Sequence, residues 1–280
     1  MKAIKISIYA LSLLGLMAAC NDYKGYQKSD DGLYYQFHTQ DANRKTAQKG
    51  DILNLSMEIK TEDDSVVQPG KELVSMMQEP KFQGDVFSAL QMMHEGDSAS
   101  FLIPAQTFYE HYNYGEIPAF VKNSKSMLHF TICIHKIQSF DEYKAEQSRL
   151  ALEQEKALID QYVQEHGITA EPTATGLYYI EQKAGKGSNP MKGQLCKVHY
   201  KGTLLDGTIF DSSLGREPFE FELGMGQVIM GWEEGIAMMK KGGKATLILP
   251  SPIAYGERGA GQVIPPYTPL VFEVELIDFK

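Results

Sequence analysis

The fold is decided by four runs of sequence: VHYKGTLLDGTIFDSS at 198–213, GWEEGIAMMKKGGKA at 231–245, AYGERGAG at 254–261 and IPPYTPLVFEVEL at 264–276. Together they hold several strand-like segments, one short helix-like segment, the single tryptophan of the chain and a group of aromatic residues around one carboxylate. The runs show no metal-ligand cluster, no phosphate-binding loop and no nucleophile beside a base. This combination predicts a peptide-binding cleft.

Alternation of side chains predicts antiparallel strands in this region. Between 270 and 278, apolar residues occupy every second position and glutamates lie between them, and similar alternation recurs at 196–200 and 245–249. Residues 232–239 instead carry apolar side chains at helical spacing, and Gly242-Gly243 ends that run. We expect half-buried strands wrapped over one short helix.

These runs resemble the FKBP-type peptidyl-prolyl isomerases, the immunophilins that bind tacrolimus, over nearly all of 193–280. The resemblance rests on several motifs in the family's order. It implies an α+β fold, rotation of prolyl peptide bonds as the activity, and neither a cofactor nor a metal. It also implies that proline-containing unfolded or extended polypeptides and tacrolimus-type inhibitors are the ligands.

The resemblance assigns roles to individual residues. It implies that four residues act on the prolyl bond: Asp211, Tyr255, Phe210 and Trp232. It implies that six others bind the substrate: Tyr200, Phe219, Val228, Ile229, Ile264 and Phe272. By the same resemblance, Tyr255 and the Ile229 N–H would donate hydrogen bonds to substrate carbonyls, and Asp211, held by Arg216, would supply a polar contact at the rotating amide.

Each of these residues also has a structural interpretation. Tyr200 and Phe272 taken singly are typical of a strand core, Asp211 is typical of a turn, and Trp232 could fill space. Only their joint occurrence in the family's order favours the cleft.

An internal repeat indicates a second copy of the unit. Gly32-Leu-Tyr-Tyr35 recurs as Gly176-Leu-Tyr-Tyr179, and Met92-Met93 recurs as Met238-Met239. The offset stays near 145 residues and drifts slightly, as loop insertions in a duplicated fold would produce. The sequence therefore predicts FKBP-like domains at 32–140 and 167–280.

The first copy has lost most of the cleft residues. By the repeat's alignment, the positions of Tyr200, Phe210, Asp211, Phe219 and Trp232 hold Met57, Val67, Gln68, Leu73 and Val86. Only Tyr109, Ile117 and Phe130 keep the character of the cleft. We expect the fold without the catalysis, in a docking, dimerisation or client-holding role. Five methionines could form an adaptable surface or fill the core: Met57, Met76, Met77, Met92 and Met93.

Residues 141–166 join the two copies and predict a long helix, because they are rich in Glu, Lys, Ala, Gln and Leu. A cap near Ser139 or Asp141 would open the helix, and Gly167 follows its end. Its second half carries an apolar stripe that we expect to pack on one of the domains: Leu158, Ile159, Tyr162 and Val163. No heptad persists long enough for a coiled coil.

Residues 1–19 are typical of an export signal, with Lys2 and Lys5 before an apolar run too short to span a bilayer. Met17-Ala-Ala-Cys20 resembles the lipobox of bacterial lipoproteins, which implies that Cys20 carries lipid and anchors the chain in the bacterial cell envelope. An ordinary signal peptide is the alternative, because Met17 stands where Leu is usual.

Asn21 follows the cysteine and favours the outer membrane in the common bacterial sorting rule. Residues 20–31 are polar and predict a flexible tether.

The net charge of −9 and the pI near 5.3 argue against a nucleic-acid partner. Cys133 and Cys196 fall in predicted strands of different domains, so we expect no disulfide between them. His129, Cys133 and His135 share a strand face and could bind a metal. We favour a solvated face, because ligands along one strand cannot close around an ion.

Two functions from different classes fit the sequence. The first is a prolyl isomerase that assists the folding of envelope proteins by means of an apolar aromatic cleft, without covalent chemistry. The alternative is a peptide-binding chaperone with little or no turnover. Retention of the main cleft positions in the second copy favours the isomerase.

Overall fold

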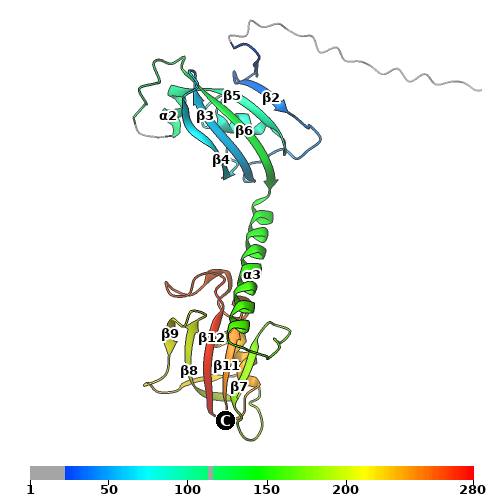
Figure 1. Ribbon diagram of the computed structural model, residues 1–280, viewed down its shortest axis with the longest axis vertical. Coiled ribbons are helices and arrows are strands. Elements are labelled where there is room, and N and C mark those ends of the chain that lie inside the picture. The colour runs from blue at the N-terminus through cyan, green and yellow to red at the C-terminus, as the bar shows by residue number, and fades with distance from the viewer. Residues whose placement is uncertain (1–22, 113–115) are drawn as a thin grey trace, which may run out of the picture. The chain divides into compact units, whose positions relative to one another are not determined.

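The computed structural model describes residues 23–112 and 116–280 (Figure 1). The chain divides into two compact units: unit 1 ends at Tyr143, and unit 2 begins at Lys144. Cys20 and the predicted export signal lie outside the described residues. Within the described ranges, no helix combines the length and the apolar composition needed to cross a bilayer.

Unit 1 is the part of the chain up to Tyr143, and its described residues form an antiparallel sheet with two short helices, followed by the start of a third. Its sheet has the order β1-β2-β5-β6-β3-β4. The elements in chain order are β1 (Gln27–Lys28), β2 (Tyr34–Thr39), β3 (Ile52–Thr61), β4 (Val66–Met76), α1 (Val86–Gln91), β5 (Ser98–Pro104), α2 (Ala105–Tyr112) and β6 (Met127–Gln138).

Unit 2, Lys144–Lys280, repeats this topology. Its sheet has the order β10-β8-β12-β11-β7, and β9 also pairs with β8. The elements are α3 (Phe140–Glu165), which begins just before the boundary, then β7 (Tyr178–Lys183), β8 (Leu195–Leu204), β9 (Ile209–Ser212), β10 (Phe219–Glu222), α4 (Met230–Ala237), β11 (Lys244–Leu249), the 3-10 turns η1 (Ser251–Ile253) and η2 (Gly256–Arg258), and β12 (Leu270–Phe279). The predicted α+β fold with two related units and a long joining helix is confirmed.

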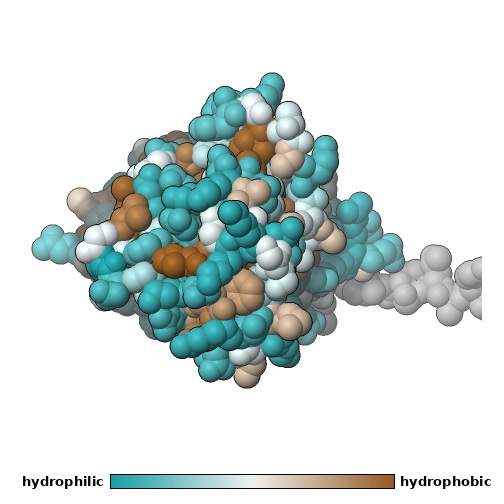
Figure 2. Space-filling view, turned by 90° about the horizontal axis from the view of Figure 1, so that it is seen from below, coloured by the Kyte–Doolittle hydropathy of each residue, from teal (hydrophilic) through white to brown (hydrophobic). Residues whose placement is uncertain are grey.

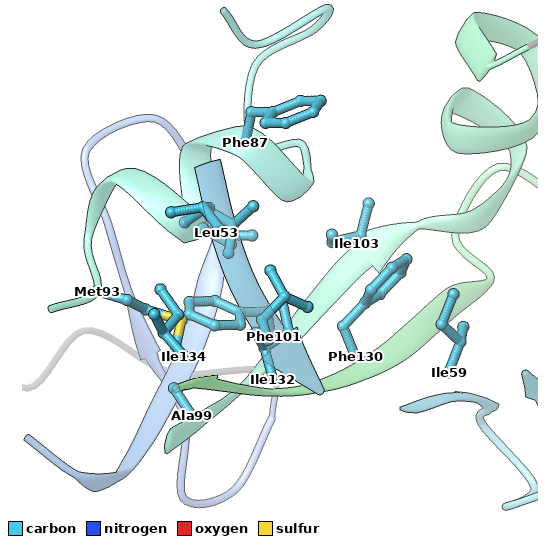
Figure 3. Close-up of a cluster of buried hydrophobic side chains, with 14 of the residues drawn as sticks. Leu53, Ile59, Phe87, Met93, Ala99, Phe101, Ile103, Phe130, Ile132 and Ile134 are labelled. Carbon is cyan, nitrogen blue, oxygen red and sulfur yellow. The ribbon is translucent and has the colours of Figure 1, made fainter. Parts of the chain in front are cut away.

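Each unit buries its own core between the sheet and the short helix. In unit 1, Phe87 of α1 belongs to the same buried cluster as Leu53 and Phe101 of the sheet (Figure 3). In unit 2, α4 packs against β11 through Gly235, where an added Cβ would lie 2.6 Å from the Leu247 side chain. The helix that carries Trp232 therefore sits directly on the sheet, which fixes the tryptophan's position. On the face in Figure 2, hydrophilic residues predominate and hydrophobic ones form small separate groups.

Helix α3 begins with a capping box. The Glu142 N–H donates to Ser139 Oγ at 3.2 Å, and the Ser139 N–H donates to Glu142 Oε2 at 2.7 Å. At its other end, Ile159 is buried with Ile248 of β11 and Val271 of β12, and Tyr162 and Val163 pack beside them. The predicted stripe thus packs on unit 2, except for Leu158, which is exposed.

One prediction for the N-terminal part needs correction. Residues 27 and 28 lie in the segment predicted to be a flexible tether, yet they form β1, paired with Tyr34 and Tyr35 of β2. The Tyr23 ring also meets the Tyr34 ring at 4.8 Å between centroids. A two-residue edge strand shows too little alternation to be recognised from sequence, which is why the prediction missed it.

Candidate active site

The cleft of unit 2 has a volume of about 460 Å³. It is lined by six aromatic side chains, one carboxylate, one amide and three small or aliphatic residues: Tyr200, Phe210, Asp211, Phe219, Gly226, Gln227, Val228, Ile229, Trp232, Tyr255 and Phe272. The structure thus brings nine of the ten cleft residues named above to one cavity. The tenth, Ile264, is buried in the adjoining core.

Strand register explains why these aromatic residues meet. On β8, Gly202 pairs with Phe272 of β12 on one side and with Asp211 of β9 on the other. A Cβ added at Gly202 would lie 2.6 Å from the Phe210 ring and 2.8 Å from the Phe272 ring. Only a glycine leaves room for both rings, which meet edge to face at 5.5 Å.

Trp232 forms the floor of the cavity. It is 4% exposed, and its ring lies edge to face with Tyr200 at 4.9 Å and with Phe272 at 5.2 Å. Phe219 stands at 6.0 Å in the same orientation. Edge-to-face packing holds each ring through the others, so the walls of the cleft are rigid.

Asp211 is held by two neighbours. Its carboxylate accepts a hydrogen bond from the Tyr200 hydroxyl and another from Arg216 at 2.8 Å. The hydrogen bond from Tyr200 lowers the pKa of Asp211, and Arg216 lowers it further, while burial raises the pKa of Tyr200 to about 12. At neutral pH the cleft therefore carries an ionised carboxylate whose charge faces a guanidinium and a phenol.

Two hydrogen-bond donors remain available beside the cleft. Among the described residues, neither the Tyr255 hydroxyl nor the Ile229 amide has a hydrogen-bond partner. Burial and the charge of Asp211 raise the pKa of Tyr255, so its hydroxyl keeps its proton at neutral pH. The site can bind two carbonyl groups across an apolar cavity.

Sequence reasoning missed three residues that shape the cavity. Gly226 and Gln227 line it directly. Ser213 lies outside the lining but fixes a wall, because its Oγ accepts from the Tyr200 N–H at 2.8 Å. Both Gln227 and Ser213 could have been suspected from their neighbours in the sequence, because Gln227 precedes the predicted cleft residue Val228 and Ser213 lies two residues after Asp211.

The same positions in unit 1 are filled. Ile59 pairs with Phe130 and Gln68, as Gly202 pairs with Phe272 and Asp211. Ile59 is buried and lies beside Phe130 (Figure 3). Phe108, which stands in α2 at the place of Ala254, packs edge to face on Phe130 at 5.4 Å. Apolar side chains thus occupy the space that stays open in unit 2.

The N-terminus of helix α1 in unit 1 is capped by a side chain. Asp85 is fully buried and caps α1, because its carboxylate accepts from the N–H groups of Phe87 and Ser88 at 2.8 and 3.0 Å. It also accepts from the Tyr112 hydroxyl at 3.0 Å. The corresponding helix in unit 2, α4, has no side-chain cap.

Two residues expected to keep the cleft's character in unit 1 do not. Tyr109 is 8% exposed, whereas Tyr255 is 39% exposed, because α2 turns Tyr109 towards the core. Ile117 is 42% exposed, whereas Ile264 is 6% exposed. Of the five methionines, only Met76 is exposed, and the rest lie in or against the core. They are mainly core filler.

The two described cysteines are free thiols. Cys196 lies in the core of unit 2, where burial raises its pKa to about 11. Cys133 Sγ lies 3.9 Å from His135 Nδ1. In the part of the chain that the structure describes, no group of three or more metal-ligating side chains comes together.

Comparison with known proteins agrees with this geometry. Residues 186–277 match the family described as FKBP-type peptidyl-prolyl cis-trans isomerase. FK506-binding protein 1 of Dictyostelium discoideum is 57% identical over 99 residues, 35% of this chain and 92% of that protein. The probable isomerase FkpA of Neisseria meningitidis is 33% identical over 191 residues, 68% of each chain. The chain therefore belongs to the FKBP-type peptidyl-prolyl cis-trans isomerase family.

Proposed function

We propose that unit 2 rotates X-Pro peptide bonds in unfolded or extended polypeptides, and that the aromatic cleft does this without a covalent step. The observation that carries the proposal is the cavity of about 460 Å³, which has a buried tryptophan floor, aromatic walls and one fully partnered carboxylate.

The chemistry needs little more than this environment. Rotation about the prolyl bond faces a barrier of roughly 18–20 kcal/mol, which the partial double bond sets. The twisted transition state loses resonance and with it much of the amide's polarity. Transfer from water to an apolar cavity therefore favours the transition state over the planar ground state.

Polar groups orient the substrate. In this proposal the Tyr255 hydroxyl and the Ile229 N–H each bind a substrate carbonyl. Tyr200 is unavailable for that task, because its hydroxyl already donates to Asp211. Asp211, fixed by Tyr200 and Arg216, presents a directed negative charge near the rotating amide.

Unit 1 is proposed to keep the fold without the activity. The support is that Ile59 and Phe108 fill the equivalent space and Asp85 occupies the N-terminus of α1. Burial of most of the methionines gives no support to a client-holding role of unit 1 that would rest on a methionine-rich surface.

The proposed location is the bacterial cell envelope, where a lipid on Cys20 anchors the chain and envelope proteins are its clients. Its support is the basic and apolar leader followed by Met17-Ala-Ala-Cys20. Mass spectrometry of the mature N-terminal peptide tests the anchor. We expect a lipidated Cys20, and an unmodified Cys20 or a retained Met1 would contradict it.

A protease-coupled assay on X-Pro tetrapeptides tests the activity of the full chain. We expect acceleration of the cis-to-trans step and inhibition by tacrolimus. A folded chain that gives no acceleration would contradict the proposal.

A further inference from the structure

Helix α3 contacts the segment that carries Tyr255 at several points along its length. Ser148 Oγ lies 2.8 Å from the Tyr267 hydroxyl, and Lys144 Nζ lies 3.4 Å from Glu257 Oε1. Further along, the Glu155 carboxylate accepts hydrogen bonds from both the N–H and the Oγ of Ser251, the latter at 2.6 Å. These contacts reach both ends of the segment 251–267.

Glu155 is the buried member of this set. It is 2% exposed, and Ser251 is 1% exposed. A buried carboxylate is costly unless hydrogen bonds compensate it, and an apolar side chain would fill the same volume without that cost. The carboxylate therefore does something that packing alone does not. It fixes the backbone N–H of Ser251.

Ser251 starts the turn that leads to Tyr255. It is the first residue of η1, and the preceding Pro250 provides no side-chain cap for that turn. Glu155 satisfies the first N–H of η1 from outside the segment. The Ala254 N–H then donates to the Ser251 carbonyl at 2.9 Å, and Tyr255 follows with its side chain lining the cleft.

We propose that Glu155 is a positioning residue for the prolyl isomerase reaction. It acts through Ser251 to hold the Tyr255 hydroxyl at the height of the substrate carbonyl. Helix α3 is then a working part of the isomerase, in addition to joining the two units. This inference rests on the proposed activity of unit 2.

Kinetics of the full chain test the inference, at a temperature where every variant is folded. We expect E155L to lower kcat/KM on X-Pro tetrapeptides by about tenfold, because a small displacement of a positioned group is costly. E155Q keeps an acceptor for the Ser251 N–H and should lose less than about threefold. S251A, which removes one of the two hydrogen bonds, should fall between them.

Two comparisons separate positioning from general stability. C196A removes a buried core atom on β8, opposite Phe221 and Phe279, and should lower the midpoint of thermal unfolding without lowering kcat/KM. A double-mutant cycle with Y255F should be non-additive, since Glu155 acts through Tyr255. Y255F should therefore cost less in the E155L background than in the wild-type chain.

The outcomes distinguish the two proposals. An active wild-type chain with E155L, E155Q and S251A all unchanged would overturn the role of Glu155 alone, as would additive effects of E155L and Y255F. If E155L does not fold, the same test is made with E155Q, S251A and their double-mutant cycles with Y255F. Lower kcat/KM with non-additive effects would support the role of Glu155, and unchanged kcat/KM or additive effects would overturn it. An inactive wild-type chain would overturn both this inference and the proposed activity.

Discussion

Units 1 and 2 share strand order and register, yet the position beside Phe272 that Gly202 leaves open in unit 2 is filled by Ile59 beside Phe130 in unit 1. The difference lies at a few positions: Ile59 stands for Gly202, Val86 for Trp232 and Phe108 for Ala254. In unit 1 the Ile59 and Phe108 side chains are buried in the core, and the smaller Val86 packs against it. The comparison teaches that the fold needs only apolar side chains that fill the core between sheet and helix. The cleft needs in addition a glycine that leaves space beside large, rigid aromatic rings.

The largest expected effect comes from giving unit 2 the unit 1 residue at the floor of the cleft. W232V should lower kcat/KM of the full chain by about 100-fold, because Val cannot support the rings of Tyr200 and Phe272. The lost volume should also cost about 3 kcal/mol of the free energy of unfolding. Tetrapeptide kinetics together with thermal unfolding would check this. A folded W232V chain with wild-type kcat/KM would show that the floor is dispensable.

A smaller effect is expected from the carboxylate. D211A should lower kcat/KM about tenfold, equivalent to about 1.4 kcal/mol, and should change the free energy of unfolding by no more than about 1–2 kcal/mol. Asp211 lies partly exposed at the edge of the cavity, which is why its structural contribution is small.

The pH dependence of D211A sharpens the same test. The pKa of Asp211 is lower in the folded chain than in the unfolded chain. Its contribution to stability is therefore present above about pH 4 and lost as the pH falls through the lowered folded pKa. Denaturant unfolding at several pH values should show that D211A lacks this acid-side loss. An identical pH profile for both chains would indicate that Tyr200 and Arg216 do not stabilise the carboxylate.

The smallest effect on activity is expected from unit 1. F108A should cost unit 1 about 3–5 kcal/mol, because a buried ring that packs on Phe130 is removed. It should leave kcat/KM of the full chain unchanged, since unit 2 holds the cleft. Thermal unfolding and tetrapeptide kinetics provide the two readouts. A large fall in activity with unit 2 still folded would show that unit 1 contributes to the reaction.

Much of the fold was predictable because its signals are local. Alternation identified strands such as β8 and β12, and composition together with a cap expected near Ser139 or Asp141 identified α3 to within a residue at each end. Most of the cleft followed from the motifs that resemble the family, because those motifs place aromatic residues at fixed points on the strands.

What escaped prediction depends on long-range contacts. In unit 1 Tyr109 is buried and Ile117 is exposed, which reverses the burial of their counterparts Tyr255 and Ile264 in unit 2. The reversal follows from α2, which stands where unit 2 has two short 3-10 turns. The contact of Glu155 with Ser251 spans 96 residues, and a glutamate in a charged helix gives no sign of burial. Pairings of this kind become visible only when the chain is folded.

The most direct test assays the two units separately, as fragments 23–143 and 144–280. The second fragment begins at the unit boundary so that Ser148, Glu155 and Ile159 keep their contacts. We predict that fragment 144–280 accelerates prolyl isomerisation and is inhibited by tacrolimus, while fragment 23–143 unfolds cooperatively but gives no acceleration. Turnover by fragment 23–143 comparable to that of 144–280, or no acceleration by a folded 144–280, would contradict the division of roles between the two units.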